Sequence, residues 1–467
     1  MDHIQSQGVA TAASRLIASA LTQTGDTFDL ALLQRAQLCL LDYLSCAFEA
    51  LQLPWSEQAA GLAVPQNSGG AHMVGRRGTY AVGDAAFANA VAGHGLVRED
   101  MHPGSVAHLG VIVWPTVLAL AERHPVTGRE LLVAAIVGYE TGARIGRAVM
   151  TQALGRLFRP TGLVGPFAAV TAGARITALN ADSALNAFAL AGNCCAGLNE
   201  WPHTGGSEMY FHPGFAVRNA LTCLELARQG ATGSATILEG EAGFFAAYAR
   251  TPLTVEPTLF QDGDAEIMSV FNKAVPACNF AQSPCQAALS VVEQLGGRRV
   301  LAVRIETTRA AVAYPGCSAS GPFERPLQAK MSIAFGVAAT LVRGGIAEAN
   351  YDALADPEIA RLMSVTTLVA DAAYTAEFPA RQGARVTVQL ADGTELSHAL
   401  DDVVPADAAL IRERFLAAAS AVLGKSAAKQ IEDLVDNLQD APDAGDLARL
   451  CALPARPDEH FLGRNPS

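Results

Sequence analysis

Charged side chains are scarce in this chain of 467 residues, and long apolar runs are missing. Charged residues make up 17% of the sequence and hydrophobic residues 50%, which favours a large buried core over disorder. The longest apolar runs are about a dozen residues, whereas a membrane span needs roughly 20. Residues 1–20 show no basic start followed by an apolar stretch, so we expect no secretory signal and a cytoplasmic protein.

Clusters of basic residues and paired cysteine motifs are also missing. The formal net charge is −12, and together with the lack of clustered Lys and Arg it argues against a nucleic-acid partner. The nine cysteines are scattered without a C-x-x-C motif, so a structural zinc site or an iron–sulfur cluster has little support. We therefore expect reduced cysteines in a core, and neither a metal nor a cofactor.

Helical spacing dominates the first half of the chain. From about Thr11 to Tyr248 the sequence is rich in Ala and Leu, and apolar residues recur with the period of a helix, as in Leu30–Leu44. The segment from Pro405 to Leu438 reads as two further helices, which we expect to pack back on the first region. These patterns predict an all-helical domain formed by residues 1–261 and 405–467.

A different pattern occupies the segment between these parts. Residues 299–308 and 384–396 alternate as strands do, the second around an Asp392-Gly393 turn. Helices are expected at 282–295 and 327–342. The sequence therefore predicts a mainly α protein with a smaller α+β domain, residues 262–404, inserted into the helical one.

The segment from His94 to His108 is the most informative stretch. It places three of the ten histidines, together with Glu99 and Asp100, within fifteen residues and directly before an apolar run, 109–121. Histidine and carboxylate groups can exchange protons near neutral pH, so this pattern predicts acid–base chemistry. An ordinary surface loop is the alternative, because Gly and Pro also mark turns.

A cationic or titratable side chain stands before an apolar run at three places in the helical region. These are His108, Arg159 in Phe158-Arg159-Pro160-Thr161-Gly162, and His212 in Phe211-His212-Pro213-Gly214. Helix starts carry free N–H groups and partial positive charge, so three of them together favour a site for a di- or tricarboxylate. Ordinary helix initiation is the alternative for each.

The α+β region contributes Lys273 and Tyr314. Lys273 has apolar neighbours, and partial burial would lower its pKa toward use as a base. Tyr314 precedes Pro-Gly and is expected at a strand end, where its hydroxyl could reach a cleft. A surface lysine that covers apolar residues with its stem is the alternative for Lys273.

Taken together, these motifs resemble the MmgE/PrpD family. The shared features are His94-x-Leu-x-x-Glu-Asp-x-His102, His108, Phe158-Arg-Pro-Thr-Gly-x-x-Gly-Pro-Phe, Phe211-His-Pro-Gly, Lys273-x-x-Pro-x-Cys and Tyr314-Pro-Gly. They run in order from about residue 10 to 440. The family includes 2-methylcitrate dehydratase, cis-aconitate decarboxylase and iminodisuccinate epimerase. The resemblance implies a metal-free homodimer with a large helical domain, a smaller α+β lid, and an active site between them.

The same resemblance implies roles for individual residues. His108, Lys273 and Tyr314 match the family's catalytic histidine, lysine and tyrosine. Glu99 and Asp100 match its acidic loop, which His102 closes. We expect Lys273 and His108 to transfer protons and Tyr314 to donate to a leaving group or intermediate, with Asp100, His102 and His212 orienting them.

Two positions depart from the family pattern. Arg159 stands where the decarboxylase and dehydratase branches usually have His, and Met209 stands where they have Lys. Arginine stays charged and binds carboxylates with two parallel hydrogen bonds, so we expect Arg159 to bind substrate, together with Thr161 and His212. The lost cation indicates a substrate with one carboxylate fewer, or with an amine near Glu208.

These observations predict an enzyme that removes a proton next to the carboxylate of a small di- or tricarboxylate. A dehydratase resembling 2-methylcitrate dehydratase is the first interpretation. An epimerase of an amino- or iminodicarboxylate and a decarboxylase resembling cis-aconitate decarboxylase are alternatives, since the reaction after proton removal decides the product. A metabolite-binding protein that has lost activity is a further alternative, which Met209 keeps open. No nucleic acid or membrane partner is expected.

Overall fold

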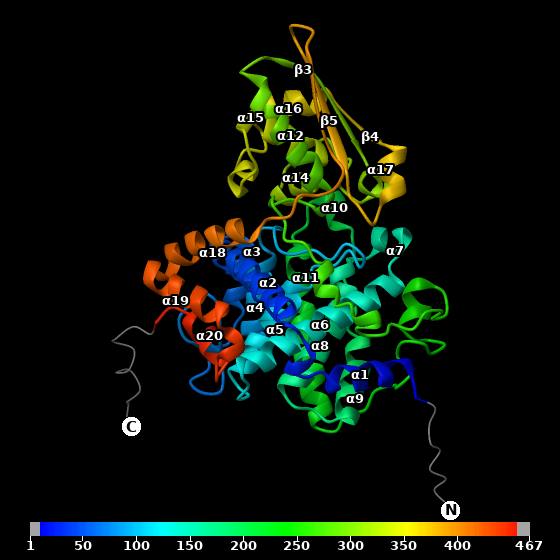
Figure 1. Ribbon diagram of the computed structural model, residues 1–467, viewed down its shortest axis with the longest axis vertical. Helices are drawn as coiled ribbons and strands as arrows, with labels where there is room; N and C mark the ends of the chain where they lie inside the picture. Colours follow the sequence, from blue (N-terminus) through cyan, green and yellow to red (C-terminus); the bar gives the residue numbers. More distant parts are fainter. Residues whose placement is uncertain (1–9, 455–467) are drawn as a thin grey trace, which may run out of the picture.

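The computed structural model describes residues 10–454 and shows a predominantly helical chain, as the sequence predicts (Figure 1). The expectation about a secretory signal falls partly on residues 1–9, which lie outside the described residues. Within the described residues, no helix is both long and apolar enough to cross a membrane.

A large helical body forms the lower part of the molecule in Figure 1. Its helices are α1 (Ala12–Thr22), α2 (Leu30–Glu49), α3 (Pro54–Gly61), α4 (Val82–His94), α5 (Gly110–Ala121), α6 (Gly128–Val149), α7 (Gln152–Leu157), α8 (Pro160–Ile176), α9 (Ala181–Gly192), α10 (Trp201–Thr204) and α11 (Glu208–Arg228). A two-residue antiparallel pair, β1 (Ala71–His72) and β2 (Thr79–Tyr80), precedes α4.

Helices α5 and α8 lie at the centre of this body because their sequences are apolar on all sides. All residues of α5 are buried, and α8 is buried except at Arg175. A helix without a polar face has to be covered all round, and α8 packs against α5, α6, α9 and α11. The fixed positions of α5 and α8 matter because each begins next to a predicted site residue.

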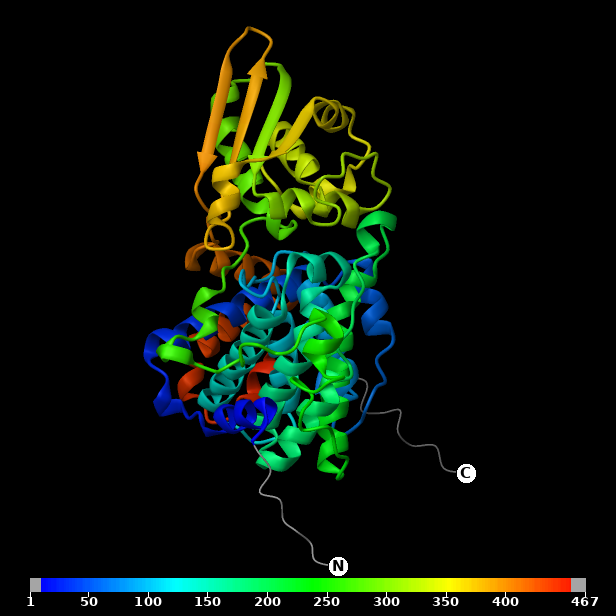
Figure 2. The same ribbon diagram turned by 90° about the vertical axis from the view of Figure 1, so that its right-hand side faces the viewer.

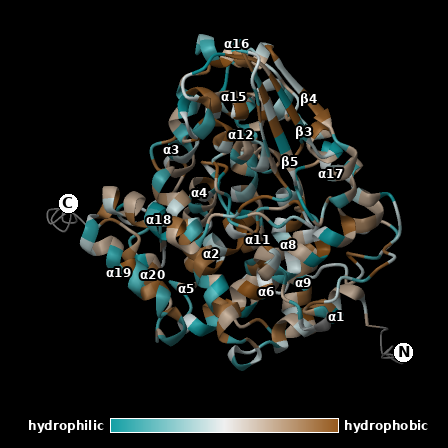
Figure 3. Cartoon of the chain, turned by 45° about the horizontal axis from the view of Figure 1, so that its top comes forward, coloured by the Kyte–Doolittle hydropathy of each residue, from teal (hydrophilic) through white to brown (hydrophobic). Residues whose placement is uncertain are grey.

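The C-terminal helices return to the helical body, so segments far apart in the sequence lie side by side. They are α18 (Ala408–Leu423), α19 (Lys425–Asp436) and α20 (Gly445–Leu450). α18 packs along α2, and α20 packs against α5. α19 buries Ala428, Ile431 and Val435 at helical spacing together with Glu432, and it presents its other hydrophilic residues outward (Figure 3).

A smaller α+β lobe stands above the helical body (Figure 2). It contains a four-stranded sheet in the order β4-β3-β5-β6. The strands are β3 (Val300–Thr307), β4 (Thr366–Ala370), β5 (Ala384–Leu390) and β6 (Glu395–Leu400). The Asp392-Gly393 hairpin and the strand near residue 300 are confirmed, whereas the parallel strand β4 was not predicted.

Helices cover the lobe sheet and connect its strands. They are α12 (Gln282–Leu295), α13 (Arg309–Ala313), α14 (Pro326–Met331), α15 (Ile333–Arg343), α16 (Pro357–Ser364) and α17 (Ala372–Glu377). The helix expected at 327–342 is divided into two, because the Ser332 side chain accepts the Phe335 N–H and starts a new helix. The exact domain boundaries at 261/262 and 404/405 stay a prediction.

Candidate active site

Most of the connection between α4 and α5 is buried, including Glu99, His102 and His108, so the surface-loop alternative for residues 94–108 is wrong. Val97 and Val106 in this connection have φ values of 59° and 53°. A branched side chain is uncommon in this left-handed region, and the surrounding structure has to hold it there. One such contact is the Lys273 ammonium, which donates a hydrogen bond to the Val97 carbonyl.

His108 is held with one ring nitrogen occupied. Its Nδ1 lies 2.9 Å from the Asp100 carbonyl oxygen and 3.0 Å from Glu99 Oε1. Both partners are acceptors, so Nδ1 carries the proton and Nε2 is left with a free lone pair. Burial lowers the His108 pKa well below 6.5, and the nearby Lys273 and Arg159 charges lower it further. A neutral His108 with a free nitrogen is able to act as a base.

Glu99 connects His108 with a second histidine. Its Oε1 lies 2.7 Å from Nδ1 of His94, and only 1% of the Glu99 side chain is exposed. Burial acts to raise the pKa of this carboxyl, but the adjacent His94 and His108 and the charge of Lys273 together hold it below its usual range. Glu99 is therefore a fixed negative charge behind both imidazoles.

Arg159 stands at the start of α8, where Pro160 occupies the first helical position. Its backbone N–H donates to the Gly197 carbonyl at 2.9 Å, and the guanidinium lies with Nη2 3.4 Å from His94 Nε2. Gly197 has φ of +115°, and a Cβ there would lie 3.2 Å from the Arg159 Cβ, so glycine suits this close approach. The Arg159 Nε is buried without a hydrogen-bond partner.

Tyr314 approaches from the α+β lobe. It follows the short helix α13, so the predicted position at a strand end is wrong; β3 ends earlier, at Thr307. The chain turns after Tyr314 because Pro315 and Gly316 end the helix. The hydroxyl is buried beside Arg159 without a hydrogen-bond partner, and burial raises its pKa.

His108, Arg159 and Tyr314 share one small cavity between the helical body and the lobe, the His108 cavity. Its other lining residues are Val97, Met101, Val106, Met209, Cys278, Asn279, Phe280 and Met331. The cavity volume is about 10 Å³, roughly the room for one water. Arg159 Nε, Tyr314 Oη and Asn279 Oδ1 are buried polar atoms without partners at this cavity, and such atoms indicate a polar occupant.

Lys273 is fully buried, so the alternative of a surface lysine is wrong. Its Nζ donates to the carbonyls of Val97 and Ala277, the second at 3.3 Å. Burial lowers its pKa, while the Glu99 charge raises it. Lys273 is not among the residues that line the His108 cavity, but its charge lies close enough to lower the His108 pKa, and its role in proton transfer stays a prediction.

Asp100 and His102 point away from the His108 cavity. The Asp100 carboxylate accepts the Gly110 N–H at 3.1 Å and the Tyr139 hydroxyl, and burial raises its pKa to about 7. His102 has both ring nitrogens occupied, by Ser105 Oγ and Glu266 Oε2, each at 2.8 Å. Their positions support orienting roles, with the Asp100 carbonyl holding His108.

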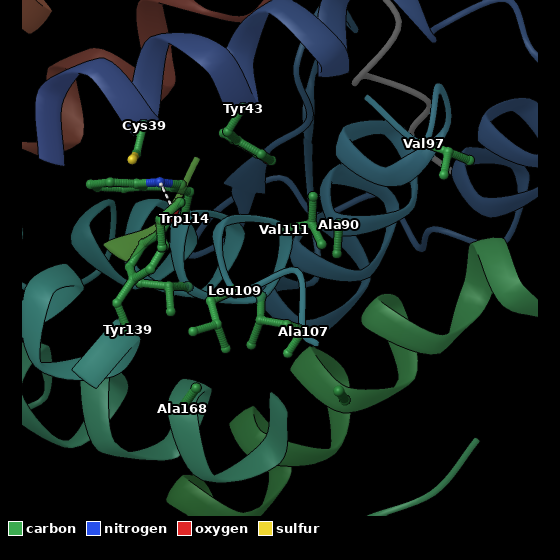
Figure 4. Packing of buried hydrophobic residues seen from close by; sticks show 14 of the residues in the cluster. Cys39, Tyr43, Ala90, Val97, Ala107, Leu109, Val111, Trp114, Tyr139 and Ala168 are labelled. Atoms are coloured by element: carbon green, nitrogen blue, oxygen red, sulfur yellow. Dashed lines mark hydrogen bonds between the residues drawn. The ribbon is translucent and has the colours of Figure 1, made fainter. Parts of the chain in front are cut away.

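The Tyr139 hydroxyl makes a second hydrogen bond in addition to the one it donates to Asp100. It accepts the Trp114 indole N–H at 3.0 Å, within a group of buried side chains that includes Leu109 (Figure 4). Because the Asp100 carboxylate accepts the first N–H of α5, this contact couples the start of α5 to the middle of α5 and α6. The start of α5 is therefore held by packing that sequence reasoning did not detect.

Thr161, His212 and Glu208 have different surroundings. Thr161 Oγ1 accepts the His108 backbone N–H at 3.0 Å. His212 is buried near Gly197, and burial, followed by the Arg159 charge, lowers its pKa to about 3. Glu208 is exposed in the first turn of α11 and does not line the His108 cavity, so its position gives no support for an amine-binding role.

The prediction of a helix start at His212 is wrong. Helix α11 begins four residues earlier, at Glu208, and Pro213 lies inside it. Proline has a helical φ but lacks the N–H that would donate to the Met209 carbonyl, so α11 continues through Pro213 with one backbone hydrogen bond fewer. Only the starts of α5 and α8 therefore meet at the His108 cavity.

Sequence reasoning missed two groups of the site. His94 was part of the informative segment but received no role, although its spacing from Glu99 was a usable signal. Asn279 was not considered, and nothing in its local sequence distinguishes it. Met209, in contrast, does line the His108 cavity, so the position where a cation was expected presents an apolar side chain.

A larger hollow lies elsewhere and contains none of these groups. Its volume is about 880 Å³, and Phe28, Arg144, Arg147, Phe260 and Glu266 are among its lining residues. Among residues 10–454, no group of three or more His, Cys, Asp or Glu side chains is arranged to hold a metal.

The chain is similar in sequence to several named proteins. Three relatives span most of the chain. A cis-aconitate decarboxylase-like protein of Aspergillus oryzae is 27% identical over 90% of this chain and 92% of its own length. A cis-aconitate decarboxylase of Aspergillus terreus is 25% identical, over 91% and 92%. A 2-methylcitrate dehydratase of Cupriavidus necator is 28% identical, over 78% and 80%.

Family models match both parts of the chain. The MmgE/PrpD N-terminal domain matches residues 15–255, and the MmgE/PrpD C-terminal domain matches residues 275–440. The two matches account for most of the 467 residues, and they confirm the resemblance that the motifs indicated. The chain belongs to the MmgE/PrpD family.

Proposed function

We propose that this protein is a lyase that removes a proton next to the carboxylate of a small substrate and then eliminates water. The observation that carries the proposal is the arrangement of His108, which has Nδ1 held by the Asp100 carbonyl and Glu99 and lines a cavity together with Arg159 and Tyr314. Relatives of two kinds, decarboxylases and dehydratases, support lyase chemistry.

In the proposed reaction, His108 Nε2 takes the proton from the carbon next to the substrate carboxylate. The electron pair moves into the carboxylate, where the Arg159 guanidinium stabilises the added negative charge. As the carbon–carbon double bond forms, the bond to the neighbouring hydroxyl breaks. Tyr314 donates its proton to that oxygen, and water leaves. Proton transfer from His108 back to the Tyr314 phenolate through solvent restores both groups.

The roles of the remaining groups follow from their contacts. Glu99 stabilises the imidazolium that forms on His108, because a carboxylate with a lowered pKa stays charged beside it. Thr161 holds the His108 backbone. The absence of a metal requirement and the homodimer implied by the resemblance stay predictions.

Decarboxylation is the second candidate, since several relatives are cis-aconitate decarboxylases. His108, first protonated on Nε2 by solvent, would then deliver that proton to an unsaturated carbon while the carbon–carboxylate bond breaks and carbon dioxide leaves, and Arg159 would hold a remaining carboxylate. The relatives named above give no support to the epimerase alternative.

Proton NMR in D2O separates these reactions. Purified protein, treated with a chelator, is incubated with a panel of four- to seven-carbon hydroxy and unsaturated di- and tricarboxylates. New vinyl signals without release of carbon dioxide support the dehydratase, and carbon dioxide release supports the decarboxylase. Exchange of a proton without an alkene supports an epimerase. Silence across the panel in protein that a thermal melt shows to be folded would contradict the proposed lyase.

A further inference from the structure

A second cavity lies next to the His108 cavity, between the helical body and the α+β lobe. Its volume is about 170 Å³, and we call it the apolar groove. Helix α7 and residues 103–106 supply one side, and helix α13 with Phe378 and Pro379 supplies the other. One water needs roughly 10–15 Å³, so the groove has room for several methylene groups.

The apolar groove and the His108 cavity share part of their walls. Val106, Phe280 and Tyr314 line both. The Phe280 ring centroid lies 5.3 Å from that of Tyr314 and 5.9 Å from that of Phe378. A continuous aromatic surface therefore leads from the catalytic hydroxyl to the far side of the groove.

The polarity of the groove limits what can occupy it. Among the described residues that line it, Arg156 is the one charged side chain, and it is solvent-exposed on α7. Met150, Ala310, Ala313 and Phe378 present apolar surface. A carboxylate needs charged or N–H donors where it is buried, so the groove suits a hydrocarbon group better than a second acid.

The His108 cavity is able to make room toward the groove. Met101, Met209 and Met331 line it, and methionine is flexible enough to repack around a ligand. Arg159 is the permanently charged cation on its wall. A carboxylate at Arg159 and a hydrocarbon group directed past Phe280 therefore match the two chemical environments.

We infer that the substrate carries an unbranched alkyl substituent of several carbons, which lies in the apolar groove while its carboxylate binds Arg159. This inference rests on the proposed function, because it places the reacting carbon between His108 and Tyr314. If the groove served only as an entrance, the alkyl substituent would not stay in it, and a longer substituent would not bind more tightly.

The direct test is calorimetric titration with alkylsuccinates, which lack the hydroxyl group that the reaction eliminates. Methyl-, ethyl-, butyl- and hexylsuccinate are titrated into the full-length protein. Each buried methylene should strengthen binding by about fourfold until the groove is full. Affinity that stays constant or falls from methyl- to butylsuccinate would overturn the inference while leaving the carboxylate site intact. If none of the four binds, both the inference and the proposed carboxylate site are wrong.

Two substitutions test whether the dependence of affinity on alkyl chain length arises in the apolar groove. Ala310→Phe fills it from α13, and Gln152→Phe fills it from α7, so a folding failure in one leaves the other. Each should remove the dependence on chain length and keep the affinity for methylsuccinate within about twofold. Ala372→Phe is the matched control, because Ala372 is exposed on α17 and does not line the groove.

Arg159→Lys tests whether all four alkylsuccinates bind with their carboxylate in the His108 cavity. It should weaken all four alkylsuccinates by the same factor, since the carboxylate contact is common to them. A weakening confined to the short compounds would show that long chains bind elsewhere on the surface, and this would overturn the inference.

Discussion

The two walls of the His108 cavity differ in chemistry. The helical body supplies His108 and Arg159, an imidazole and a permanent cation, both placed directly at or before the start of a central helix. The α+β lobe supplies Tyr314 and the apolar surface of Phe280 and Met331. The permanent charge and the proposed base thus come from the helical body and the proposed proton donor from the lobe, whereas both walls contribute apolar surface.

The two walls also differ in how they are held. On the body side, His108 has hydrogen bonds from its ring and from its backbone, and Asp100 is fixed through Tyr139 and Trp114. On the lobe side, the Tyr314 hydroxyl has no partner. The His108 ring is thus fixed by the helical packing, whereas the Tyr314 hydroxyl, like Arg159 Nε, is free to bond to a ligand.

The largest effect is expected from removing the base on the body wall. His108→Gln should lower kcat/KM by roughly 100- to 10,000-fold, the usual contribution of a general base, without unfolding the protein. His102→Gln is the matched control, since this buried histidine points away from the cavity. Steady-state kinetics with circular dichroism checks both. Equal losses in the two variants would contradict the assignment of His108.

A smaller effect is expected from the lobe wall. Tyr314→Phe removes the hydroxyl but keeps the ring, and kcat should fall by roughly 10- to 100-fold with KM nearly unchanged. The reason is that Tyr314 donates its proton to the leaving oxygen, and this interaction becomes strong only as the carbon–oxygen bond breaks. Tyr374→Phe on α17 should have no effect and serves as the control. A kcat for Tyr314→Phe within twofold of wild type would move this hydroxyl out of the mechanism.

Arg159→Lys tests whether the body wall also binds the substrate. The two parallel hydrogen bonds of a guanidinium are lost while the charge remains, so KM should rise by about tenfold or more with a modest change in kcat. Arg218→Lys, on α11 and paired with Asp84, is the control. An unchanged KM would remove Arg159 from the binding site.

The smallest change in kcat/KM is expected from a change of pH. Only neutral His108 accepts a proton, so activity falls as pH drops through the His108 pKa. Because burial lowers this pKa well below 6.5, kcat/KM should stay constant from about pH 8 to 6.5 and decline only in more acidic solution. In Glu99→Gln the decline should move to lower pH still, since Glu99 raises the His108 pKa. A midpoint at or above 6.5 would contradict the burial argument.

Much of the fold was readable from local patterns. The period of apolar residues predicted the two C-terminal helices, and the Asp392-Gly393 turn predicted the β5–β6 hairpin. Strand β4 was missed because it pairs in parallel with β3 across more than fifty residues of chain, and a pairing of this kind leaves no turn signal next to it.

The sequence by itself determined the family and the concentration of histidines and carboxylates between residues 94 and 108, because both are properties of residue type and spacing. The tertiary structure decided which of those groups face the cavity. Lys273, His102 and Glu208 carry suitable chemistry, yet Lys273 bonds to backbone carbonyls, His102 pairs with Glu266, and Glu208 lies at the surface. Orientation and burial depend on contacts between distant segments, and these set both the hydrogen-bond partners and the pKa of each group.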